Sequence, residues 1–202
     1  EYLGCSPDDV EFDGEKVVNL KTKEEITRKE IGNKVMCSSN APLSATEAFS
    51  SPVSPPPFMV GIAEVEIDKE TGVVEPIDYA AVVDCGTVVN PNLARVQTEG
   101  GIAQGIGMAL YEDIIYSEKG KNYSNSFMQY KIPSRLDVGE IRVEFESSYE
   151  PTGPFGAKSI GEIVINTPSP AISNAVQNAV GVIVRELPIT AEKVYKGMAE
   201  KE

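Results

Sequence analysis

The glycine-rich segment Gly153–Glu162 is the part of this 202-residue sequence whose residue types are best suited to chemistry. Its three glycines let a backbone approach another group closely or adopt φ values that other residues avoid. Its carboxylate, Glu162, stands directly before the apolar run Ile163–Ile165, so we expect partial desolvation, which makes a carboxylate a better proton acceptor near neutral pH. Because the chain contains no histidine, a general base must be a residue of another type.

Two readings of Glu162 stay open at this level. In the first, a tight loop holds the carboxylate against a ligand as a general base. In the second, Glu162 is a turn carboxylate near the start of an ordinary strand. An ion pair with the nearby Lys158 would favour the charged carboxylate and weaken it as a base.

A second candidate is the segment Gln97–Gly107, which is rich in glycine and contains two amides. Gln97 and Gln104 are seven residues apart, so on a helix they share one face. The glycines admit a neighbouring strand in one interpretation, and in the other they clear space while an amide contacts a polar cofactor. The lysine and hydroxyl of a phosphate-binding Walker loop are absent from this segment.

A third candidate, Asn125–Asp137, combines aromatic residues and methionine around a proline. Such a cluster is more often a plug of the hydrophobic core than a substrate pocket. We therefore expect it to be buried and keep the pocket as the alternative.

Composition limits the classes of partner. A formal net charge of -13 argues against nucleic acid and against an anionic membrane surface as partners. No apolar run approaches the roughly 18 residues of a membrane-spanning helix. The acidic residues, spread along the chain, fit a solvated surface.

The cysteines limit the kinds of site. Cys5, Cys37 and Cys85 are far apart and form no C-x-x-C pair, which fits a reducing cytoplasm. Three scattered thiols without histidine argue against an iron–sulfur cluster held by this chain alone and against a zinc site. We therefore expect no metal ligated directly by these side chains.

Hydrophobic periodicity and turn residues predict an α+β fold with β-hairpins, a mixed sheet, a glycine-rich helix and C-terminal helices. The expected elements are hairpins over 10–18 and 62–83, strands over 114–116 and 141–145, and helices over 22–32, 91–112, from Ser169-Pro170 onward, and from Thr190 onward. Four prolines within Ser50–Pro57 exclude helix there and indicate an extended connection. We expect two parts, a polar N-terminal segment over 1–57 and a C-terminal domain over 58–202.

Several segments together resemble the molybdenum-binding subunit of the xanthine dehydrogenase and aldehyde oxidase family. The resemblance lies in their order and spacing as well as in their residues, and it covers about residues 58 to 198. The segments are Asp84–Pro91, Gln97–Gly107, Tyr130–Ser134, Gly156–Glu162 and Leu187–Thr190.

The resemblance implies a molybdopterin-binding fold and the hydroxylation of an N-heterocycle or an aldehyde with oxygen from water. It implies that a pyranopterin, rather than protein side chains, holds the molybdenum. Glu162 matches the catalytic glutamate that accepts a proton, and Gln97 matches a glutamine that hydrogen-bonds the cofactor. The adjacent backbone of Lys158, Ser159, Ile160 and Gly161 lines the same site in this reading.

The family's molybdenum subunit is several times longer than this chain. The resemblance therefore implies partners: the N-terminal half of that subunit, iron–sulfur and FAD modules, a small-molecule substrate and an oligomeric assembly in the cytoplasm. The sequence begins at Glu1, and we expect it to be a fragment or a processed subunit that cannot hold the cofactor alone. Two alternatives are a non-catalytic interaction module that keeps the family fold and an inert fragment.

Overall fold

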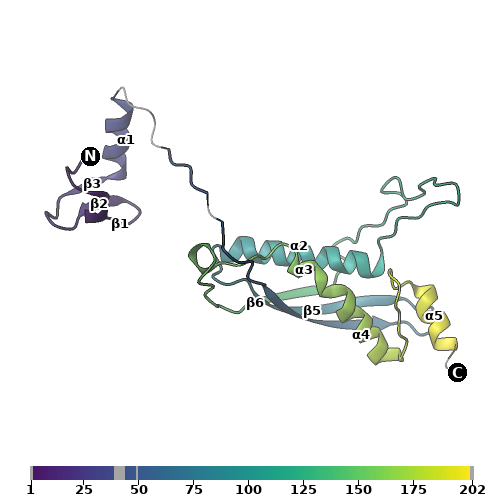
Figure 1. Ribbon diagram of the computed structural model, residues 1–202. Helices are drawn as coiled ribbons and strands as arrows, with labels where there is room; N and C mark the ends of the chain where they lie inside the picture. The colour runs from purple at the N-terminus through teal and green to yellow at the C-terminus, as the bar shows by residue number, and fades with distance from the viewer. Residues whose placement is uncertain (1, 39–43, 49, 201–202) are drawn as a thin grey trace. The chain divides into compact units, whose positions relative to one another are not determined.

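The computed structural model describes residues 2–38, 44–48 and 50–200, and it divides into two compact units (Figure 1). The first unit is Glu1–Phe49 and the second is Ser50–Glu202. All residues singled out above for chemistry lie in the second unit. In the described part of the chain, no helix is long and apolar enough to cross a membrane.

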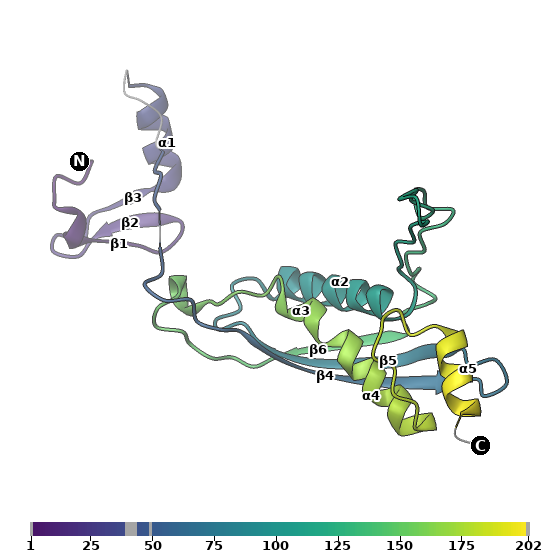
Figure 2. The ribbon, with the colours of Figure 1, turned by 45° about the vertical axis from the view of Figure 1, so that its right-hand side comes forward.

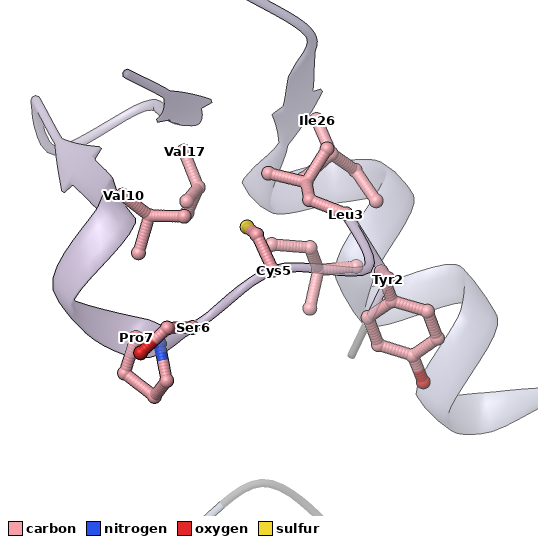
Figure 3. Close-up of a pocket in the computed structure, with 9 residues that line it drawn as sticks. Tyr2, Leu3, Cys5, Ser6, Pro7, Val10, Val17 and Ile26 are labelled. Atoms are coloured by element: carbon pink, nitrogen blue, oxygen red, sulfur yellow. The ribbon is translucent and has the colours of Figure 1, made fainter. Parts of the chain in front are cut away.

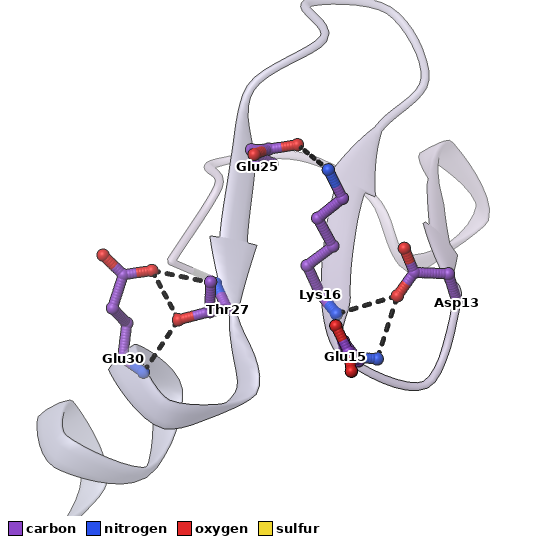
Figure 4. Close-up of polar contacts among 6 residues, drawn as sticks. All are labelled: Asp13, Glu15, Lys16, Glu25, Thr27 and Glu30. Carbon is purple, nitrogen blue, oxygen red and sulfur yellow. Dashed lines mark hydrogen bonds and ion pairs between the residues drawn. The ribbon is translucent and has the colours of Figure 1, made fainter.

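The N-terminal unit is a small antiparallel sheet followed by one helix. Strands β1 (Val10–Phe12), β2 (Lys16–Asn19) and β3 (Glu25–Thr27) pair in that order, preceded by the short 3-10 helix η1 (Pro7–Asp9). The predicted hairpin over 10–18 is confirmed. Its turn is held by Asp13, whose side chain accepts hydrogen bonds from the main-chain N–H groups of Glu15 and Lys16 (Figure 4).

The predicted helix over 22–32 is wrong at its start. Residues 25–27 form β3, and helix α1 (Arg28–Met36) begins only after Thr27. Thr27 and Glu30 form a complete capping box, in which the Thr27 hydroxyl accepts from the Glu30 N–H and the Glu30 carboxylate accepts from the Thr27 N–H (Figure 4). Thr22 and Glu25 have the same spacing, but Thr22 lies in a turn closed by the Asn19 side chain.

The C-terminal unit contains a mixed three-stranded sheet. Strands β4 (Phe58–Ile67) and β5 (Val74–Asp84) form the predicted long hairpin, and β6 (Glu140–Phe145) pairs in parallel with β5. Along β4, exposed and partly buried residues alternate, so one face meets the core while the other stays open. The open face carries apolar side chains, with Val60 65% and Ile62 67% exposed.

Helices cover the other face of this sheet (Figures 1 and 2). They are α2 (Pro91–Leu110), α3 (Ile163–Asn166) and α4 (Pro168–Val180), with α5 (Ala191–Ala199) near the C-terminus. The core joins sheet and helices through the buried Tyr79, Ala81 and Val143 on the strands and Ile102 and Ile172 on the helices. The predicted α+β fold, with a glycine-rich helix on a mixed sheet, is confirmed.

The starts of α2 and α5 follow the sequence closely. The Asn90 side chain accepts from the Leu93 N–H at 3.1 Å, and Pro91 occupies the first helical position of α2. Thr190 caps α5 as expected. The helix expected from Ser169-Pro170 onward starts earlier than predicted, because α4 already begins at Pro168.

The glycines of α2 admit a helical segment rather than the expected strand. A Cβ on Gly101 would lie 2.2 Å from Val164 Cγ2, and one on Gly105 would lie 2.6 Å from Pro168 Cγ. The backbone of α2 therefore approaches α3 and the start of α4 closely. Ile163–Ile165, read above as the start of an ordinary strand, belongs to α3.

The segment 112–137, between α2 and β6, projects from the domain as an arm in both views (Figures 1 and 2). The strand expected over 114–116 is wrong, since Tyr116 makes only an isolated bridge with Asn122. The core plug expected over 125–137 is also wrong: Phe127 is 83% and Leu136 94% exposed. The prediction took aromatic and apolar content as a sign of burial. The arm instead folds back on itself and does not pack against the core.

Candidate functional site

The glycine-rich loop is fastened to the end of strand β5 by main-chain hydrogen bonds. Gly86 and Ala157 form an isolated antiparallel bridge. The Lys158 N–H donates to the Cys85 carbonyl at 2.7 Å, and the Thr87 N–H donates to the Gly156 carbonyl at 2.8 Å. The first half of the loop thus continues the sheet locally, which sets the direction in which residues 159–162 leave it.

The three glycines of the loop differ in whether the structure leaves room for a side chain. Gly156 has φ +81°, and a Cβ there would lie 2.3 Å from the Tyr149 ring. A Cβ on Gly153 would lie 2.0 Å from the Ala157 carbonyl oxygen. A Cβ on Gly161 would meet nothing within 4 Å in the chain. Gly153 and Gly156 therefore serve the turn, whereas nothing in the described chain requires Gly161 to lack a side chain.

Lys158 is paired with Asp84 and not with Glu162. Its ammonium Nζ lies 2.6 Å from Asp84 Oδ2 and 5.2 Å from the centre of the Phe58 ring, and its side chain is only 7% exposed. Asp84 also accepts from the Ser148 hydroxyl at 2.6 Å. The hydrogen bond from Lys158, followed by that from Ser148, lowers the pKa of Asp84 to about 2. The considered ion pair between Lys158 and Glu162 is thus wrong.

This pairing predicts a specific acid sensitivity. The pKa of Asp84 lies below its ordinary value of 3.8, so its contribution to stability is complete above about pH 4 and is lost as the pH falls toward 2. Asp84→Asn should destabilise the chain at pH 7, because it leaves the Lys158 ammonium without a counter-charge. The difference from the unchanged chain should shrink between pH 4 and pH 2 in urea unfolding. A difference that stays constant over this range contradicts the assignment.

A groove of about 330 Å³ brings the first half of α2 and the glycine-rich loop together. Three of the predicted cofactor-binding residues, Gln97, Lys158 and Ile160, line it. The other lining residues are Cys85, Thr87, Val88, Val89, Asn90, Leu93, Ala94 and Ala157. Ser159, Gly161 and Glu162 follow the same loop and are exposed, but they do not line the groove as the described residues form it.

Several polar groups around this groove are unused. Among the residues that the structure describes, the side chains of Gln97 and Glu162 and the main-chain N–H groups of Ser159, Ile160 and Gly161 have no hydrogen-bond partner. Glu162 lies directly before α3 and is exposed, so the predicted desolvation is wrong for this chain. These unpaired donors and acceptors are free for a polar ligand.

The residues that hold the loop in place were not found as site residues from the sequence. Asp84 was part of a recognised motif, but nothing in the sequence linked its carboxylate to Lys158, 74 positions away. Ser148 carried no signal at all. Cys85, buried beside the groove, was considered only as a free thiol, and burial raises its pKa.

Two further hollows lie apart from these residues. One, of about 320 Å³, lies between Glu99 and Ala103 of α2 and residues 133–135 at the base of the arm. The other, of about 260 Å³, is in the N-terminal unit, where Leu3, Val10 and other apolar residues surround Cys5 (Figure 3). Within the described parts of the chain, no group of three or more His, Cys, Asp or Glu is placed to hold a metal ion.

A family comparison covers the part of the chain that includes β5 and α2, on one side of this groove. Residues 1–139 match the model of the molybdopterin cofactor-binding domain. The chain belongs to this family. The match takes in the N-terminal unit of this molybdopterin cofactor-binding domain, which the motifs recognised in the sequence did not cover.

The chain is similar to subunits of dehydrogenases and to a solved oxidoreductase. It is 31% identical to the 6-hydroxypseudooxynicotine dehydrogenase complex subunit gamma of Paenarthrobacter nicotinovorans, over 96% of this chain and 26% of that protein. It is 34% identical to the xanthine dehydrogenase molybdenum-binding subunit of Escherichia coli O157:H7, over 76% and 21%. The crystal structure of quinoline 2-oxidoreductase from Pseudomonas putida 86 superimposes with a TM-score of 0.81 and 28% identity, over 98% and 27%. The chain thus spans about a quarter of the length of these relatives.

Proposed function

We propose that this chain forms one wall of the molybdopterin site of a molybdenum hydroxylase, an oxidoreductase that inserts oxygen from water into its substrate. The observation that carries the proposal is the groove in which Gln97 on α2 meets Lys158 and Ile160 of the glycine-rich loop. Family membership supports the cofactor class, and the groove supports the place that we propose for it on this chain.

The free polar groups fit such a cofactor. A pterin with a phosphate tail offers many acceptors, and the unpaired N–H groups of Ser159, Ile160 and Gly161 are consecutive main-chain donors, as in other anion-binding loops. The Gln97 amide supplies a further donor and acceptor from the facing helix. The open space at Gly161 lets a bulky ring system approach the backbone. When bound, the cofactor supplies the redox chemistry.

Glu162 is the residue of this chain that we assign to proton transfer. Hydroxylation of a carbon by water releases protons, and a carboxylate with no other polar partner can accept one. Because Glu162 is exposed here, the environment that tunes it as a base comes from the cofactor, the substrate and the rest of the protein.

We further propose that the remaining part of a longer molybdenum subunit covers the outer face of α2. The exposed residues of this face repeat at helical spacing and none is charged: Leu93, Val96, Gln97, Gly100, Gln104 and Met108. A free helix face without charge is unusual for a solvated surface and typical of a buried interface. Iron–sulfur and FAD modules that accept the electrons, and an oligomeric assembly, complete the proposed enzyme.

For the substrate, we propose a class of compounds and no single compound. The names of the relatives include 6-hydroxypseudooxynicotine, xanthine and quinoline, so an N-heterocycle is the best-supported class, with an aldehyde as the second. A cytoplasmic location remains a prediction from the cysteine pattern.

The test compares two exposed amides on two helices. In the whole molybdenum enzyme, Gln97→Ala should weaken cofactor retention about 2- to 10-fold, because one hydrogen bond is lost. Gln177→Ala is the control, since Gln177 is an exposed amide on α4 and does not line the groove. The measurement is molybdenum and pterin content per protein after dialysis. Equal contents in both variants would remove Gln97 from the site.

A further inference from the structure

We propose that the ion pair between Asp84 and Lys158 is a positioning device that sets the backbone of residues 158–161 at the groove. The inference rests on the proposed function, because it explains how the loop is presented to the cofactor. It assigns to the Lys158 side chain a role in holding the loop, in place of contact with the ligand or with Glu162.

Four segments that are distant in the sequence meet at this ion pair. Asp84 ends β5 and accepts, besides Lys158, the Ser148 hydroxyl and the Gly86 N–H at 3.0 Å. The Lys158 ammonium lies over the ring of Phe58, at the start of β4. The ion pair thus connects the start of β4, the end of β5, the segment after β6 and the glycine-rich loop at one point.

The pair acts on the loop at close range. Lys158 is held at both ends, with its main-chain N–H on the Cys85 carbonyl and its ammonium on the neighbouring residue Asp84. The next three residues, Ser159, Ile160 and Gly161, have main-chain N–H groups without a partner in the described part of the chain. Holding Lys158 in place therefore fixes where the backbone of residues 159–161 begins. The N–H groups of these three residues remain free to bind a ligand.

An ion pair suits this task better than a contact between neutral groups. The Lys158 ammonium is almost fully buried, and a buried ammonium without its carboxylate is strongly unfavourable. The loop therefore has little freedom to turn Lys158 outward. A neutral side chain of similar length fills similar space but removes this restriction.

The experiment measures amide hydrogen exchange of residues 156–158, the loop residues whose main-chain N–H groups are hydrogen-bonded, in the whole molybdenum enzyme. Lys158→Met should raise exchange of these amides by about tenfold or more and lower molybdenum content, while Lys158→Arg, which keeps the charge, should restore both. Arg142→Met is the matched control: Arg142 pairs with Asp78 on the open face of the same sheet, and its loss should leave the loop unchanged.

The outcomes separate the two proposals. Loop exchange in Lys158→Met equal to that of the unchanged enzyme overturns the positioning role. If this variant does not fold, Ser148→Ala decides, since it removes one hydrogen bond to Asp84 without stranding a charge; unchanged loop exchange in it also overturns the role. Faster loop exchange with unchanged molybdenum content supports the positioning role and instead contradicts the placement of the cofactor at this loop.

Discussion

Replacing Glu162 by Gln in the whole molybdenum enzyme should lower kcat by about 10²- to 10⁴-fold, the usual contribution of a general base. The amide has nearly the same shape as the carboxylate but cannot take up the proton. In the described part of the chain the Glu162 side chain makes no hydrogen bond or ion pair, so the substitution breaks no contact that stabilises the fold. The measurement is steady-state turnover together with molybdenum content.

Glu144→Gln provides the matched control for this experiment. Glu144 is an exposed carboxylate on β6, so the change in charge and size is the same. Its turnover and molybdenum content should both equal those of the unchanged enzyme. Near-normal turnover of Glu162→Gln, with molybdenum retained, contradicts the assignment of Glu162 as the base.

Two neighbouring glycines of α2 should respond to alanine with opposite signs. Gly101→Ala should destabilise the chain by about 1–3 kcal/mol, because its Cβ would lie 2.2 Å from Val164, a fully buried side chain that has no room to move. Gly100→Ala should stabilise it by up to about 1 kcal/mol, because a Cβ at Gly100 meets nothing within 4 Å and alanine favours helix.

Urea unfolding of the chain measures both changes under one set of conditions, with the slope compared to confirm that the transition stays the same. Each variant serves as the control for the other, since both add one methyl group to the same helix. Equal effects of the two substitutions would show that α2 does not approach α3 as closely as the structure has it.

Where local signals decided the structure, the sequence predicted it well. The β4–β5 hairpin follows from alternating residues on both sides of a polar turn, and Asn90-Pro91 sets the start of α2. The predictions from sequence failed in two situations. In one, two segments carried the same helix-capping pattern, and in the other, apolar residues were assumed to be buried. Thr22 and Thr27 both precede a glutamate by three residues, and only pairing of β3 with β2 shows which of them caps α1.

Apolar content was a poor guide to burial in the arm. Phe127 and Met128 were read as core residues, but they are exposed, since the segment folds back on itself away from the sheet. An apolar residue type indicates that burial of the side chain is favourable in free energy. It does not indicate which surface of the protein, if any, covers that side chain.

For the candidate site, the sequence by itself determined the residue types: an exposed amide on a glycine-rich helix, a loop with three glycines and a carboxylate at its end. These are local properties, because they depend on the spacing of residues along the chain and on the backbone φ angles that each residue type prefers. Only the tertiary structure decided that Lys158 pairs with Asp84, that Gly101 and Gly161 serve different purposes, and that Gln97 and Ile160 share one groove. Such contacts join positions up to 74 residues apart, and they depend on how the strands and helices pack, which no local pattern records.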